Sequence, residues 1–163
     1  MCLDATPAEQ SAPEIQWERE DQIILEAISI LQKRVFNPHS PLCSPNDLKQ
    51  YMRLRLTNQK RVMFGVVFMH ADYRPIDFEI MFYGSLTESR IYATQILERV
   101  LHHNAAAVML VHNRPSGNDI PSDSDKAVTR RLREALGLFD LAVVDHLIVG
   151  NEAPFSFAEH GLI

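Results

Sequence analysis

The residues best suited to chemistry lie in one stretch, VHNRPSGNDIPSDSD, which runs from Val111 to Asp125. His112 stands where an apolar segment ends, and Asp125 follows a polar loop, in the expected first turn of a helix. A loop that returns the chain to the same place would let a histidine nitrogen meet an aspartate oxygen, and Zn²⁺ binds such ligands at about 2.0–2.2 Å. Catalytic zinc needs three protein ligands and a water in the fourth position. The stretch therefore predicts two ligands of a zinc site.

Arg114 stands where a second histidine would complete this ligand set. A guanidinium is permanently protonated and has no lone pair to donate, so it cannot bind a metal ion. Arginine does match carboxylate geometry with two parallel hydrogen bonds. We therefore expect Arg114 to pair with Asp125, Glu79 or both, in the place of the metal ion. Three further histidines could replace the missing ligand, although their spacing does not favour them: His102, His103 and His146.

Hydrophobic periodicity indicates the elements that position these residues. The ranges expected to be helical are 21–35, 45–56, 91–103 and 122–137. The ranges expected to be strands are 61–70, 76–84, 106–112 and 141–150, and the first two form a hairpin. This order makes a mixed sheet flanked by helices, which is an α/β or α+β-like architecture in a single domain.

Length and composition fit one soluble globular domain. The chain has 163 residues, of which 46% are hydrophobic and 23% charged. We divide it into a disordered N-terminal tail (1–18), an N-terminal helical segment (19–57) and the main domain (58–163). The tail lacks the features of a signal peptide, and no apolar run is long enough to cross a membrane.

Charge and cysteine content bear on the expected cellular compartment and on DNA binding. Cys2 and Cys43 form no disulfide framework, so we expect a reducing cytoplasm. The net charge of −5 counts against non-specific DNA binding, which depends on cations that neutralise phosphates.

Several separated motifs resemble one protein family. Glu79 followed by His112, Arg114, Ser122 and Asp125 is similar to the JAMM motif of the JAB/MPN metalloprotease fold, an upstream glutamate followed by H-x-H-x7-S-x2-D. Four segments of the sequence resemble motifs of the bacterial RadC branch of this fold. They are EIMFYGSL from residue 79, HNRPSG from 112, VDHLIVG from 144 and FSFAEHGLI from 155. The resemblance covers residues 61–163.

The resemblance implies a JAB/MPN sheet with cytidine deaminase-like layering and a zinc-dependent site that cleaves amide or isopeptide bonds. In that site Glu79 would be the general base, His112 and Asp125 zinc ligands, and Ser122 a donor to the oxyanion. Ser122 and Asp125 also have the spacing of a helix capping box, and both roles are compatible.

Two motif positions depart from the family. Arg114 replaces a histidine ligand, and the V-H-P-R-E segment is replaced by IYATQ from residue 91. Three interpretations remain open: a RadC-like scaffold with an impaired site that binds a protein or peptide, a working zinc metallopeptidase, or a DNA-repair-associated accessory protein. The sequence does not give the oligomeric state.

Overall fold

The structure is a computed structural model that describes residues 12–39, 44–84 and 92–163, with side chains from Glu18 onward. Part of the predicted tail, part of the proline-rich loop, both cysteines and Ile91, the expected start of a helix, lie outside the described residues.

Four helices and five strands make up the described chain. The helices are α1 (Ala12–Val35), α2 (Pro45–Leu56), α3 (Ala93–His103) and α4 (Asp123–Gly137). The strands are β1 (Met63–Met69), β2 (Pro75–Tyr83), β3 (Ala107–Asn113), β4 (Ala142–Val149) and β5 (Phe155–Ser156). They form one sheet in the order β2-β1-β3-β4-β5, in which β3 and β4 are parallel and the other neighbours antiparallel. The predicted single mixed sheet flanked by helices is confirmed.

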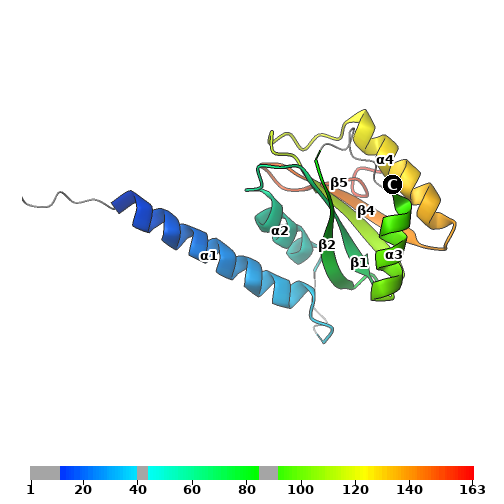
Figure 1. The fold of residues 1–163 in the computed structure, drawn as a ribbon, viewed down its shortest axis with the longest axis horizontal. Helices are drawn as coiled ribbons and strands as arrows, with labels where there is room; N and C mark the ends of the chain where they lie inside the picture. Colours follow the sequence, from blue (N-terminus) through cyan, green and yellow to red (C-terminus); the bar gives the residue numbers. More distant parts are fainter. Residues whose placement is uncertain (1–11, 40–43, 85–91) are drawn as a thin grey trace, which may run out of the picture.

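The helices cover the two faces of the sheet in pairs (Figure 1). The core on one face joins the sheet to α3 and α4, with Leu110 and Leu132 fully buried. The core on the other face joins it to α1 and α2, with Met52 and Val111 fully buried. The N-terminal part of α1 projects away from the rest of the molecule (Figure 1). None of the described helices is long and apolar enough to cross a lipid bilayer.

The predicted boundaries hold best where a cap defines them. Ser44 caps α2 in a capping box with Asp47, and Pro45 occupies the first turn, an arrangement that the residue types from Ser44 to Asp47 favour. Helix α1 begins at Ala12, earlier than the expected residue 21 and inside the predicted tail. Helix α4 ends at Gly137, as expected, and its C-cap is Leu138 in a right-handed conformation.

Strand β2 does not alternate as cleanly as its sequence suggests. Register irregularities interrupt its pairing with β1 near both ends of the strand. As a result Phe78 packs against the core of α1 and α2, whereas Ile76, Met81 and Phe82 pack against the core of α3 and α4. Strict alternation would place Ile76, Phe78 and Phe82 on one face and Met81 on the other, and the observed packing differs because an irregular pair changes the phase of the side chains.

Candidate metal centre

The candidate centre lies where β3 ends and α4 begins. His112 is the second-last residue of β3, and its side chain points to the same side of the sheet as Leu110. Asp125 lies in the first turn of α4, and both side chains are only 2% exposed. The loop between them turns at Gly117, where φ is +84° and a Cβ atom would lie 2.2 Å from Nδ2 of Asn151. Glycine is therefore required for the turn that brings the two residues together.

Ser122 fixes Asp125 from the N-cap of α4. Its hydroxyl accepts a hydrogen bond from the Asp125 backbone N–H at 3.2 Å and donates one to Oδ2 of Asp125 at 2.7 Å. Its own backbone N–H also donates to Oδ2, at 2.7 Å. The predicted capping box is present, and the serine hydroxyl is directed at the carboxylate.

The predicted metal ligands face each other. Nε2 of His112 lies 3.5 Å from Oδ1 of Asp125. Two ligand atoms of a tetrahedral zinc ion, each about 2.0–2.2 Å from the metal, are separated by about 3.4 Å. Nε2 is also the one buried side-chain atom of the described residues that has no hydrogen-bond partner. The spacing and the unpaired nitrogen fit two ligands of such an ion.

Arg114, at the sequence position of the third ligand, contacts Asp125. Its Nη2 donates to Oδ2 of Asp125, and its Nη1 donates to the Ile120 carbonyl at 2.7 Å. The Arg114 side chain is 21% exposed, whereas that of Asp125 is 2% exposed. Arg114 pairs with Asp125, as expected, whereas Glu79, the other expected partner, lies elsewhere. The described residues at the end of β3 and the start of α4 do not fit a catalytic zinc, because only two of the required three ligands are present there and a cation adjoins them.

Two residues lie behind His112: His146, which the sequence offered as a replacement ligand, and Thr129, which it did not single out. Nε2 of His146, on β4, lies 2.8 Å from Nδ1 of His112. Nδ1 of His146 lies 2.6 Å from the hydroxyl of Thr129, which also donates to the Asp125 backbone carbonyl at 2.7 Å. His146 does not replace the missing ligand, because both of its ring nitrogens are engaged. The i, i+4 spacing of Asp125 and Thr129 on α4 was the available signal for this contact.

Burial decides the ionisation of the centre. It lowers the pKa of His112 to about 4, although the charge of Asp125 opposes this shift, and it lowers the pKa of His146 as well. Burial acts to raise the pKa of Asp125, but hydrogen bonds from Ser122 and nearby positive charge outweigh it and the pKa is lowered. At neutral pH the centre therefore holds two neutral imidazoles, one carboxylate and one guanidinium.

Among the described residues, the side chain of Glu79 forms no hydrogen bond or ion pair with His112, Arg114, Ser122 or Asp125. In the register of the sheet, Glu79 of β2 lies opposite Val66 of β1, and Val66 lies opposite Leu110 of β3. Leu110 is two residues before His112. Two strand spacings of about 4.8 Å and two residues of about 3.4 Å put the Cα atoms of Glu79 and His112 roughly 12 Å apart. Its role as general base stays a prediction.

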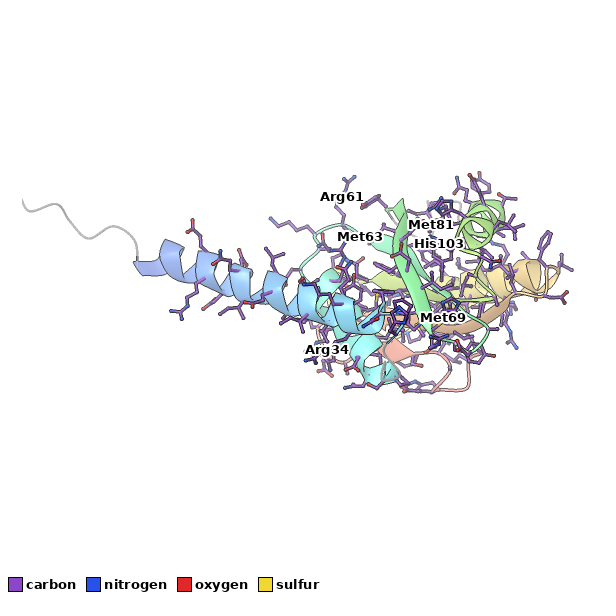
Figure 2. All side chains as sticks on the ribbon, turned by 90° about the horizontal axis from the view of Figure 1, so that it is seen from below. Arg34, Arg61, Met63, Met69, Met81 and His103 are labelled. Carbon is purple, nitrogen blue, oxygen red and sulfur yellow. The ribbon has the colours of Figure 1, made fainter. Side chains whose placement is uncertain are left out.

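The carboxylate of Glu79 is bound instead by α3. Arg99 donates to both oxygens, at 2.7 Å and 2.5 Å, and Nε2 of His103 lies 2.7 Å from one of them. Figure 2 shows His103 beside β2, on the side of the sheet that α3 covers. Hydrogen bonds from Arg99 hold the pKa of Glu79 at about 2. Such a carboxylate accepts protons poorly at neutral pH.

A second group of potential ligands includes the same glutamate. Ligand atoms of Asp77, Glu79 and His103 all lie within 4.8 Å of one another. Both oxygens of Glu79 already accept hydrogen bonds from Arg99, and Asp77 is exposed. The group is compatible with a divalent cation, but it would have to displace a guanidinium.

The single mixed five-stranded sheet flanked by helices is consistent with a JAB/MPN domain. The model of one protein family, described as the RadC-like JAB domain, matches residues 42–162. The chain belongs to this family.

Two relatives at moderate identity share the name UPF0758 protein. UPF0758 protein YeeS of Escherichia coli K12 is 38% identical over 144 residues, which cover 88% of this chain and 97% of the relative. A UPF0758 protein of Azotobacter vinelandii is 45% identical over 118 residues, which cover 72% of this chain and 53% of the relative. The chain thus spans nearly the whole of the first relative and about half of the second.

Proposed function

We propose that this chain is a RadC-like JAB domain in which Arg114 takes the place of the zinc ion, so that it binds a protein or peptide without hydrolysing it. The observation that carries the proposal is the contact of the Arg114 guanidinium with Asp125, beside an unpaired Nε2 of His112. A permanent cation neutralises the buried carboxylate that zinc would otherwise neutralise.

The position of Glu79 supports the loss of hydrolysis. A general base must reach the water that it deprotonates, directly or through one further water. The Glu79 carboxylate is instead held by two side chains of α3, at a pKa of about 2. Among the described residues, the centre of β3 and α4 therefore lacks contact with the glutamate expected as general base, and Arg114 contacts the carboxylate that a metal ion would share.

The proposal of a protein or peptide partner rests on exposed apolar residues of α1. Ile23, Leu25 and Ile30 of α1 are exposed, and this helix projects from the domain (Figure 1). Exposed apolar side chains on a projecting helix support a protein or peptide partner over a small polar ligand. The cytoplasmic location expected from the cysteine content stays a prediction.

Metal content tests the proposal. We expect the natural chain to retain far less than one zinc per chain after dialysis, and Arg114→His to retain close to one. Complete sites in small zinc domains contribute about 10–16 kcal/mol, so a third ligand should restore several kcal/mol of binding. Elemental analysis of both proteins measures this directly. Arg114→Met is the matched control, because it removes the charge without adding a ligand.

Hydrolysis gives the second readout. We expect no turnover of a fluorogenic isopeptide substrate by the natural chain, with or without added zinc. Stoichiometric zinc in the natural chain together with ordinary turnover would show that it is a working metallopeptidase.

A further inference from the structure

The hydrogen bonds behind His112 determine where its proton lies. Thr129, His146 and His112 form a buried chain of contacts that runs from α4 through β4 to β3. Each contact needs one hydrogen, so the donors can be assigned in sequence. At one end of this series of hydrogen bonds, only one donor is possible.

That end is the backbone carbonyl of Asp125. Its oxygen lies 2.7 Å from the Thr129 hydroxyl oxygen, and a carbonyl has no hydrogen to give. Two oxygens at this distance need a hydrogen between them, so Thr129 must donate. A hydroxyl has a single hydrogen, so Thr129 can only accept at its 2.6 Å contact with Nδ1 of His146.

The remaining protons follow from this assignment. His146 carries its hydrogen on Nδ1, which leaves a lone pair on Nε2 of the neutral ring. That lone pair accepts a hydrogen bond from Nδ1 of His112 at 2.8 Å. His112 is then a neutral imidazole whose own lone pair lies on Nε2, the atom that faces Oδ1 of Asp125 at 3.5 Å.

We infer that Thr129 and His146 are positioning residues that hold His112 in the tautomer with its lone pair on Nε2, directed at the position that Arg114 has filled. The inference rests on the proposed function, since it assumes that this position is a former metal position. Without Thr129, the opposite tautomers would be favoured, because an N–H of His112 would then face Oδ1 of Asp125 instead of a second lone pair.

The tautomers can be read in the natural chain without any metal. Long-range ¹H–¹⁵N NMR spectra of the chelator-treated protein distinguish protonated from unprotonated ring nitrogens. We expect hydrogen on Nδ1 of both His112 and His146. We expect Thr129→Val to move both hydrogens to Nε2, and Thr129→Ser, which keeps the hydroxyl, to leave them on Nδ1. Hydrogen on Nε2 of His112 in the natural chain would overturn the inference, whether or not the variants fold.

Cobalt binding gives a second readout that does not depend on activity. In the Arg114→His background, we expect Thr129→Val to weaken Co²⁺ binding by about 10–100-fold, the usual effect of losing a group that orients a ligand. Thr129→Ser should restore it. Equal affinities in all three proteins would contradict a positioning role.

The two proposals fail in different ways. Bound zinc in the natural chain would contradict the proposal that Arg114 takes the place of the zinc ion. It would leave the tautomer assignment intact. The reverse tautomer in a zinc-free natural chain would contradict the positioning role and leave the proposed function intact.

Discussion

At the scale of the residue, one substitution determines the character of the candidate centre. Arg114 cannot donate a lone pair, and its guanidinium reaches the carboxylate that a metal ion would share. The cost of burying Asp125 as an anion is offset by this contact and by hydrogen bonds from Ser122. The centre can therefore be electrostatically balanced without a metal ion.

The contact between Glu79 and Arg99 should make the stability of the fold depend on pH. Hydrogen bonds from Arg99 lower the pKa of Glu79 to about 2, below the usual value of 4.5. A lowered carboxyl pKa in the folded state contributes stability above pH 4.5, and this stability is lost as the pH falls toward 2. We expect Arg99→Met to raise the pKa of Glu79 and to lower the free energy of unfolding at pH 7 but not near pH 2.

A carboxyl titration by NMR, combined with urea denaturation at several pH values, measures both effects. Arg133→Met, which removes an exposed arginine without an ion pair to the described residues, is the control. An unchanged Glu79 pKa in Arg99→Met would show that the contact with Arg99 does not hold in solution.

At the scale of the element, α4 links the fold to the centre. Its first turn provides Ser122 and Asp125, and its second turn provides Thr129, whose hydroxyl reaches His146. The helix connects the parallel strands β3 and β4, so its N-terminus is placed beside the end of β3 where His112 lies. A capping box and a candidate ligand thus share one carboxylate.

The capping boxes at Ser44 and Ser122 allow a matched comparison. Removing a serine N-cap usually costs about 0.5–2 kcal/mol. We expect Ser44→Ala to cost about 1 kcal/mol, and Ser122→Ala to cost more, about 1.5–2 kcal/mol, because the Ser122 hydroxyl also donates to Asp125. Urea denaturation of both variants measures the difference. A smaller loss for Ser122→Ala would mean that its bond to the carboxylate adds no stability.

At the scale of the whole molecule, the charge distribution bears on DNA. The net charge is −5, yet Lys126, Arg130 and Arg133 line a hollow of about 560 Å³ between α4 and the C-terminal residues. None of these three cations forms an ion pair with a described residue. A locally basic surface on an acidic domain can bind phosphates only weakly.

We therefore expect duplex DNA binding at low salt alone, with a log–log salt slope no steeper than about −3, since three phosphate contacts give about −2.7. Replacing Lys126, Arg130 and Arg133 by glutamine should abolish it. The same replacement at Arg55, Lys60 and Arg61 is the control. Fluorescence anisotropy measures both, and tight binding at physiological salt would instead support the DNA-associated interpretation.

The sequence alone determined much of the fold, because the signals were local. The capping boxes at Ser44 and Ser122 and the change from helical to alternating periodicity are properties of neighbouring residues, and the structure confirms them. The phase of β2 could not be predicted, because the irregularities arise only when it pairs with β1.

The candidate centre also has features that the sequence predicted and features that only the structure shows. Spacing along one loop predicted that His112 and Asp125 would meet and that a guanidinium could join them. Only the tertiary structure decided that Glu79 is held by α3, and that Thr129 and His146 lie behind His112. Those contacts join residues from separate strands and helices, and the physical reason is that sheet register, which no short stretch of sequence encodes, decides which side chains become neighbours.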